Sequence, residues 1–207
     1  MALEDFFSLF CDWYNLNSPF LRSFGHVSED TFANMWTNKW FAKKQQQVIM
    51  DTYLKKYQHL FDVDVDELQE HLQGQNLLVF RIACLILWDQ ISRNIFRGTA
   101  NAYATDGKAR ALVEKIIPFW DNLPTPIKVS CILVYIHSED IHDLEKVNEY
   151  INKISSEMGN FPSVFTALKG VAKNHYDRMI MFGRIPERNI LLNRKSTAEE
   201  ESYLAAF

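Results

Sequence analysis

The sequence contains few of the residues that interrupt helices and no pattern that builds sheets. Only 7 Gly and 6 Pro are spread over 207 residues, and no region alternates apolar and polar residues with the two-residue period of a strand. Apolar residues recur instead at helical spacing along most of the chain. The sequence therefore predicts an all-α protein.

Cysteine and long apolar runs are also scarce. Cys11, Cys84 and Cys131 are an odd number without CxxC spacing, and each lies in an apolar stretch. This pattern argues against a disulfide framework and favours a reducing compartment, so we expect a cytoplasmic protein. No apolar run approaches the ~18 residues of a membrane span. The early acidic residues Glu4 and Asp5 argue against a secretory signal.

An excess of positive charge is absent as well. The formal net charge is −4, so we expect neither nucleic acid nor an anionic membrane as a partner. Charge is uneven, however, because the stretch 169–195 holds seven basic and two acidic residues. RNA contact through this stretch is therefore the weakest of the hypotheses that we keep.

The residues that are present predict a single large core. Apolar residues make up 47% of the chain, with 5 Trp, 8 Tyr and 15 Phe, which is typical of a globular domain. No linker divides the chain, so we predict one domain over 1–207, built from antiparallel helix pairs as in bundles or tetratricopeptide-like stacks. No exact repeat of ~34 residues is visible. Periodicity predicts helices over 2–15, 28–38, 41–61, 64–72, 75–96, 105–120, 125–137, 139–157, 161–182 and 196–205.

Several residues predict where these helices begin and end. Ser28 fits a helix start, and Pro162 suits a first helical turn. Ser196 and Glu199 have the spacing of a capping box, in which the hydroxyl and the glutamate each bind a backbone N–H. Gly183 is expected to end the long helix before a loop.

The most informative segment follows the seven-residue apolar run 82–88. It carries five side chains rich in hydrogen-bonding groups, namely Asp89, Gln90, Arg93, Asn94 and Arg97. On a helix, the four-residue spacing places the aspartate and both arginines on one stripe. Such a stripe is typical either of a helix C-terminus, where cations complement the dipole, or of a pocket for carboxylate or phosphate.

Two further segments combine charged and imidazole groups. His137, Ser138, Glu139 and Asp140 close another apolar run. Ser138 could cap the next helix, with both acids in its first turn, but this interpretation leaves His137 without a partner. His137 and His142 are five apart, which is poor spacing for two metal ligands on one helix face, so we predict no metal site.

The third segment lies at the end of the long helix. His175 and Arg178 are three residues apart, and the Gly/Pro-shaped loop that follows carries Arg184, Arg188 and Asn189. This loop is either a recognition loop or a solvated surface. Neither a GxSxG, Walker A, GxGxxG nor HExxH motif is present, so the sequence leaves the cofactor unspecified.

Together these motifs resemble the mostly bacterial family called "domain of unknown function 924". The resemblance rests on Asp89-Gln90-x-x-Arg93-Asn94-x-Phe96-Arg97-Gly98-Thr99-Ala100, on His137-Ser138-Glu139-Asp140, on Phe182-Gly183-Arg184-x-Pro186-x-Arg188-Asn189 and on Arg194-x-Ser196-Thr197-x-Glu199-Glu200. Trp40-Phe41-x-Lys43 and Asp106 also match. The resemblance covers residues 36–207 and only weakly the N-terminal helices in 1–35. It implies an all-helical, tetratricopeptide-like fold and no established activity.

The chain departs from that family's pattern at four positions. Ser92, Ile136, Glu187 and Asn193 stand where the family usually has Pro, Glu, His and Gly, respectively. Two of these changes remove an acidic residue and a histidine, which are candidate chemical groups.

Two hypotheses about function follow. In the first, the motifs converge on a pocket for an anionic small molecule, whether as ligand or as substrate. Arg93, Arg97, Arg184 and Arg188 would bind the anion, His137 would be the general acid or base with Glu139 orienting it, and His175 would be a second proton-transfer group. In the second, a groove binds an acidic peptide or a C-terminus, or the arginines pair internally with Asp89, Asp106, Glu139 and Glu200 as a structural ion-pair network.

Overall fold

The computed structural model describes residues 2–206 and contains no strand among them. Eleven α-helices are present in these residues. Their bounds are α1 Ala2–Tyr14, α2 Glu29–Met35, α3 Lys44–Leu54, α4 Val65–Gln69, α5 Gly74–Ile86, α6 Ser92–Ile95, α7 Asp106–Ile116, α8 Thr125–Ile136, α9 Ile141–Lys153, α10 Pro162–Phe182 and α11 Ala198–Leu204. The all-α prediction is therefore confirmed.

Shorter helical turns extend or join these helices. Two are π-helical, Trp36–Trp40 and Leu87–Ile91. The others are 3₁₀ turns: Leu21–His26, Lys55–Asp62, Ala100–Tyr103, Ile117–Asn122, Glu157–Asn160 and Pro186–Arg188.

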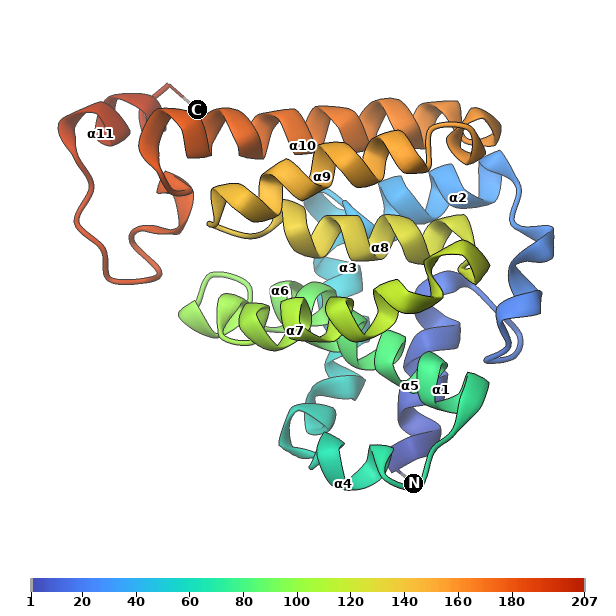
Figure 1. Ribbon diagram of the computed structural model, residues 1–207. Coiled ribbons are helices and arrows are strands. Elements are labelled where there is room, and N and C mark those ends of the chain that lie inside the picture. Colours follow the sequence, from blue (N-terminus) through green and yellow to red (C-terminus); the bar gives the residue numbers. More distant parts are fainter. Residues whose placement is uncertain (1, 207) are drawn as a thin grey trace.

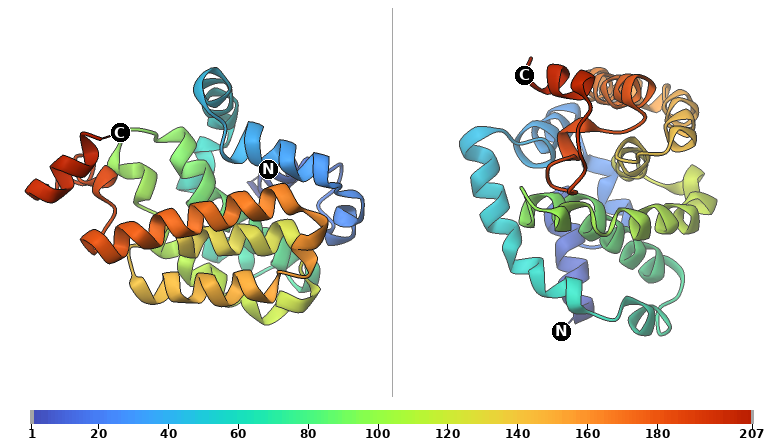
Figure 2. Two further views of the ribbon diagram at one scale, coloured as in Figure 1. Left: turned by 90° about the horizontal axis from the view of Figure 1, so that it is seen from above. Right: turned by 90° about the vertical axis from the view of Figure 1, so that its left-hand side faces the viewer.

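The helices pack in chain order as a stack of neighbours. α1 packs on α5, α5 on α7, α7 on α8, α8 on α9, and α9 on α10. Figure 1 shows α7 to α10 lying one above another, with α1 crossing beneath and α4 at the far end. The loop after α10 leads to α11 at the edge of the stack, as both views in Figure 2 show. Short connections thus give one all-α domain, whereas tetratricopeptide-like packing stays a prediction.

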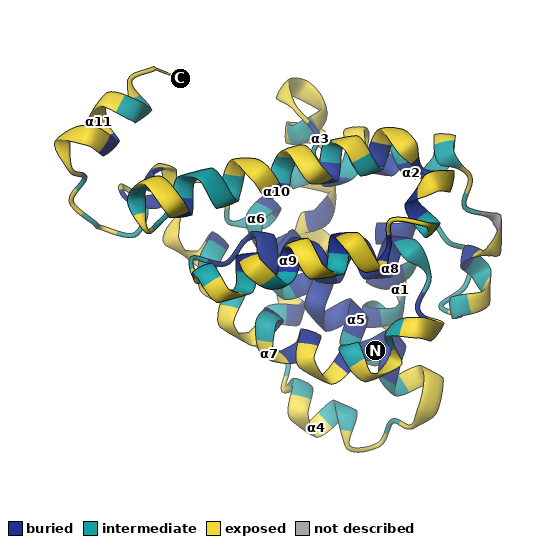
Figure 3. Cartoon of the chain, turned by 45° about the horizontal axis from the view of Figure 1, so that its top comes forward, coloured by how far each residue is buried: buried dark blue, intermediate teal, exposed yellow. Residues whose placement is uncertain are grey.

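The core is centred on α5 and α8. Every residue from Pro126 to Ile136 is buried, because α8 has neighbours on several sides. A helix that is apolar all round is expected at the centre of a domain. Figure 3 shows buried residues gathered at this centre and exposed ones on α4, α10 and α11. Among the described helices, none has both the length and the apolarity of a membrane span.

The sequence does not indicate where an α-helix changes into a π or 3₁₀ turn, as happens within the predicted helices 28–38, 41–61, 75–96 and 105–120. The predicted helix 41–61 is α3 followed by the 3₁₀ turn Lys55–Asp62, and 75–96 contains the π turn Leu87–Ile91. Periodicity could not show either change, because both kinds of turn keep apolar residues near helical spacing.

The structure confirms three of the predicted helix signals. Ser28 caps α2 by accepting a hydrogen bond from the Thr31 N–H, Pro162 lies in the first turn of α10, and Gly183 ends α10 with φ 67°. A left-handed residue at this position favours glycine.

Two capping predictions were wrong. The capping box is formed one residue later, by Thr197 and Glu200, because Ser196 instead accepts a hydrogen bond from Asn189. At α9 the cap is Asp140, which accepts from the His142 N–H. In each case two adjacent polar residues could serve, and tertiary contacts select the one that caps.

Candidate functional site

The π turn Leu87–Ile91 is held by polar side chains of the segment that follows it. Ser92 Oγ donates to the Trp88 carbonyl at 2.8 Å, and Asn94 Nδ2 donates to the Gln90 carbonyl at 2.9 Å. Arg93 Nη1 donates to the carbonyl of Asp89 at 2.8 Å. A π turn disturbs the regular i→i+4 bonding of a helix, and three consecutive side chains here donate to its carbonyls.

This turn positions Asp89 against His137 at the C-terminus of α8. The Asp89 carboxylate is 1% exposed and accepts from His137 Nδ1 at 2.9 Å. Burial would raise the pKa of Asp89, but His137 and Arg93 outweigh it and lower this pKa to about 2. Burial lowers the pKa of His137, with Asp89 opposing. Because Nδ1 carries the proton, Nε2 of the neutral ring has a free lone pair.

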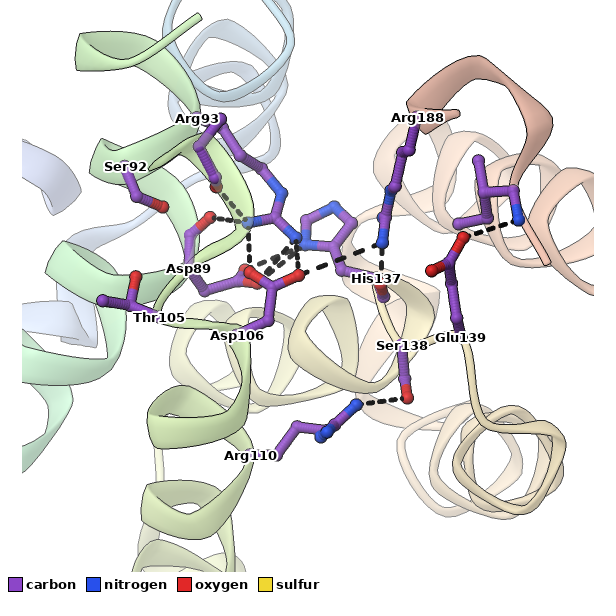
Figure 4. A network of polar contacts seen from close by, with 12 residues as sticks. Asp89, Ser92, Arg93, Thr105, Asp106, Arg110, His137, Ser138, Glu139 and Arg188 are labelled. Carbon is purple, nitrogen blue, oxygen red and sulfur yellow. Dashed lines mark hydrogen bonds and ion pairs between the residues drawn. The ribbon is translucent and has the colours of Figure 1, made fainter. Parts of the chain in front are cut away.

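Arg93 and Arg188 lie on either side of this histidine (Figure 4). Arg93 donates two hydrogen bonds to Asp106, at 2.8 and 3.0 Å, which satisfies both oxygens of that carboxylate. Arg188 donates from Nη2 to the His137 carbonyl at 2.9 Å, and its Nη1 is 3.9 Å from Asp106. The Tyr103 ring packs against both guanidinium groups, 5.6 Å from that of Arg93 and 4.8 Å from that of Arg188.

A cavity of about 280 Å³ opens between these groups. Its size is just below the range of typical small-molecule sites, so only a compact ligand would fit. Segments far apart in the sequence contribute its walls: α6, the loop that follows it, and the ends of α8 and α10. The lining residues are Arg93, Arg97, Gly98, Ala102, Tyr103, His137, His175, Arg178, Ile185, Glu187 and Arg188.

His175 brings a second neutral imidazole to this cavity from α10. Its ring centre lies 6.0 Å from that of His137. Nδ1 donates to the Val171 carbonyl at 3.0 Å, so Nε2 carries the lone pair here too. Burial, reinforced by His137, lowers the pKa of His175 to about 3. Within residues 2–206, no group of three or more His, Cys, Asp or Glu is arranged to hold a metal ion.

Two of the expected site residues, Arg184 and Asn189, instead fix the loop after α10. Arg184 forms an ion pair with the buried Glu200 at 2.6 Å. Asn189 donates to the same carboxylate and to Ser196. These contacts place Arg184 and Asn189 outside the cavity lining.

Glu139 also differs from its expected position. It accepts hydrogen bonds from the Ile185 N–H at 2.7 Å and from Arg194 at 2.8 and 3.0 Å. Burial would raise the pKa of Glu139, but Arg194 and this backbone donor lower it. The group that orients His137 is therefore Asp89 from another helix, not its near neighbour in the sequence.

Two further expected residues, Gln90 and Arg97, support the walls of the cavity. Gln90 donates to the Asp89 carboxylate, which completes its set of partners. Arg97 lines the cavity but is paired with Asp51 at 2.7 and 3.0 Å. The internal ion-pair network that the sequence offered as an alternative is thus present for Arg93, Arg97 and Arg184, although with Asp51 as an unforeseen partner.

Sequence reasoning missed Tyr103 and noted Arg178 without giving it a role. Tyr103 packs against both central arginines, yet it lies in a short 3₁₀ turn that periodicity does not predict. Arg178 on α10 forms an ion pair at 2.6 Å with Glu187 in the loop that follows this helix. The three-residue spacing from His175 to Arg178 was the available signal for the latter.

Comparison with known proteins agrees with the motifs. The model of the family described as "bacterial protein of unknown function (DUF924)" matches residues 22–206, so the chain belongs to this family. The match starts earlier than the resemblance in the sequence motifs, which began at residue 36.

A solved structure of a protein of unknown function from Agrobacterium tumefaciens is similar to this chain. The two are 27% identical, with a TM-score of 0.63, over 82% of this chain and 89% of the other. No curated protein matches the chain. The comparisons therefore support the fold and the family, and the chemistry must be argued from the site.

Proposed function

We propose that the cavity beside His137 binds a compact anionic molecule, one that presents a carboxylate or a phosphate. The proposal rests on Arg188. Its side chain is almost completely buried and lines the cavity, yet only one of its five N–H donors makes a hydrogen bond within residues 2–206. A guanidinium with unused donors facing a small cavity is suited to a carboxylate or phosphate oxygen.

Electrostatics supports the same assignment. Burial lowers the pKa of Arg188, and the nearby Arg93 lowers it further. Arg93 is already matched by Asp106, so Arg188 is the guanidinium that gains most from a negative ligand. An anion there would relieve both the loss of solvation and the repulsion between the two cations.

The proposed chemistry is proton transfer at His137. Asp89 fixes its tautomer, so Nε2 can accept a proton from a ligand hydroxyl, a water or an acidic C–H group within about 3 Å. A bound anion would stabilise the imidazolium that forms. Ser138 is unsuited as a nucleophile, because its hydroxyl donates to Asp143 at 2.7 Å and accepts from Arg110 at 2.8 Å.

A thermal-shift experiment with matched variants tests the binding. Inorganic phosphate, acetate, malonate and phosphoglycolate would be added to the wild type, to Arg188→Gln and to Arg184→Gln. A ligand at 100 times its Kd stabilises by about 2.7 kcal/mol, which is a melting shift of roughly 5–10 °C for a chain of this length.

Only the Arg188→Gln variant should lose the shift, since Arg184 is committed to Glu200. A shift that survives in Arg188→Gln, or that acidic peptides produce and small anions do not, would remove the support for a small-molecule site.

A further inference from the structure

A second cavity lies on the other side of the π turn, between α4 and the pair formed by α5 and α7. Its volume is about 400 Å³. Figure 1 shows α4, whose residues line one wall of the cavity, below α5 and α7. None of its lining residues belongs to the cavity beside His137, so the two sites are separate.

The floor of this cavity is apolar. Phe80, Cys84 and Leu112 line it and are buried, and Trp88 closes one end. Positions 81, 84 and 88 on one side, and 108, 111, 112 and 115 on the other, follow helical spacing, so each helix presents one continuous face. A hydrocarbon chain or an aromatic ring would be removed from water on this floor.

Three cations surround the floor without acidic partners. Arg81, Lys108 and Lys115 form neither an ion pair nor a hydrogen bond with any residue in the described part of the chain. Lys108 lies 5.6 Å from the centre of the Trp88 ring. Nε of Arg81 is buried without a hydrogen-bond partner, and the terminal N–H groups of the same guanidinium make no hydrogen bond within the described part of the chain, so they are available to an external carboxylate.

Two acidic residues on the opposite wall already accept hydrogen bonds from groups within the chain. Asp64 accepts from the N–H groups of Asp66 and Glu67 as the cap of α4. Asp66 accepts from Gln69 Nε2 at 2.6 Å. Neither reaches the three cations, so the positive side of the cavity stays unmatched.

We propose that this second cavity binds an amphipathic monocarboxylate, with its apolar part on the floor of Phe80, Cys84 and Leu112 and its carboxylate at Arg81. Lys108 and Lys115 add to the attraction from α7. The site is independent of the proposed function at His137, because the two cavities share no residue.

Calorimetric titration of the whole chain with decanoate, below its micelle concentration, tests this proposal. Each buried methylene is worth about a fourfold change in affinity, so decanoate should bind roughly tenfold or more tightly than octanoate. Decanol has the same chain without the charge and should bind at least about tenfold more weakly than decanoate.

Variants locate the site. Arg81→Gln should raise the Kd of decanoate at least about tenfold. Ala111→Glu changes an exposed residue of the lining and should weaken binding by repulsion without altering the core. Lys153→Gln removes an equal charge from a distant surface ion pair and should have no effect.

Three results would overturn the proposal: no binding of decanoate, equal affinity for decanol, or an unchanged Kd in both Arg81→Gln and Ala111→Glu. Binding that is instead lost in Arg188→Gln and kept in Arg81→Gln would assign decanoate to the first cavity and also overturn it.

Discussion

At the scale of single residues, the site is defined by which polar groups have partners and which do not. Arg93, Arg97 and Arg184 donate hydrogen bonds to carboxylates, whereas Arg188 lies 3.9 Å from Asp106 without such a bond and lines the cavity with His137. The arginine motifs therefore serve two purposes at once. Most of their members hold the walls, and Arg188 is the one that we propose binds a ligand.

Asp89→Asn should destabilise the protein by about 1.5–3 kcal/mol, because it removes the buried charge-assisted hydrogen bond from His137 and one of the two anionic neighbours of Arg93. Urea unfolding at pH 7 measures this loss. Asp51→Asn serves as the control, since its partner Arg97 is partly exposed and a surface ion pair contributes about 0–1 kcal/mol. Equal losses of unfolding free energy in the two variants would contradict the claim that Asp89 holds His137 and Arg93 in place.

At the scale of elements, the π turn Leu87–Ile91 is the feature on which the site depends. Its Trp88 carbonyl accepts from both Ser92 Oγ and Thr105 Oγ1, at 2.8 and 2.6 Å. Because two donors share one acceptor, either can be lost without leaving the carbonyl unpaired.

Ser92→Ala and Thr105→Val should each cost about 0.5–1 kcal/mol, and the double variant about 1 kcal/mol more than their sum. The excess arises because only the double variant removes both side-chain donors from the Trp88 carbonyl. A double-mutant cycle by urea unfolding measures it. Strict additivity would mean that the two hydroxyls do not support the turn together.

The start of α11 gives a second prediction at this scale. Thr197→Ala should lower stability by about 1 kcal/mol, since Thr197 caps the helix and forms a capping box with Glu200. Ser196→Ala, one residue earlier, should cost less because Ser196 only accepts from Asn189. The reverse order of the two losses would speak against this cap.

The periodicity of the sequence predicted the helices, but it predicted only part of the site. The four-residue spacing placed Asp89 and Arg93 on one stripe, and three motifs led to one cavity. The partners could not be found in this way. Asp89 lies 48 positions from His137, and Asp51 lies 46 from Arg97. Such contacts depend on how helices stack, which local spacing does not encode.

At the scale of the whole molecule, two neutral histidines, one buried and one partly buried, make stability depend on pH. A histidine in the unfolded chain takes up a proton near pH 6.5. Burial lowers the pKa of His175 to about 3 and also lowers the pKa of His137. Below pH 6.5 the unfolded chain therefore binds more protons than the folded one, and stability falls as pH falls.

Between pH 7 and pH 5 the loss from His175 alone should be about 2 kcal/mol. Urea unfolding at the two pH values measures it, and His175→Gln should lose less by about that amount. The carboxylates contribute little in this window, because they titrate below it. A pH dependence that is the same with and without His175 would show that this ring is not held neutral in the folded protein.

The central claim is that an anion binds between Arg188 and His137. The most direct measurement is an NMR titration of the histidine side chains with inorganic phosphate and with malonate, in the wild type, Arg188→Gln and Arg184→Gln. The account predicts saturable shifts of the His137 and His175 signals in the wild type and Arg184→Gln, and their loss in Arg188→Gln. Unchanged histidine signals in the wild type, or the same shifts in Arg188→Gln, would contradict it.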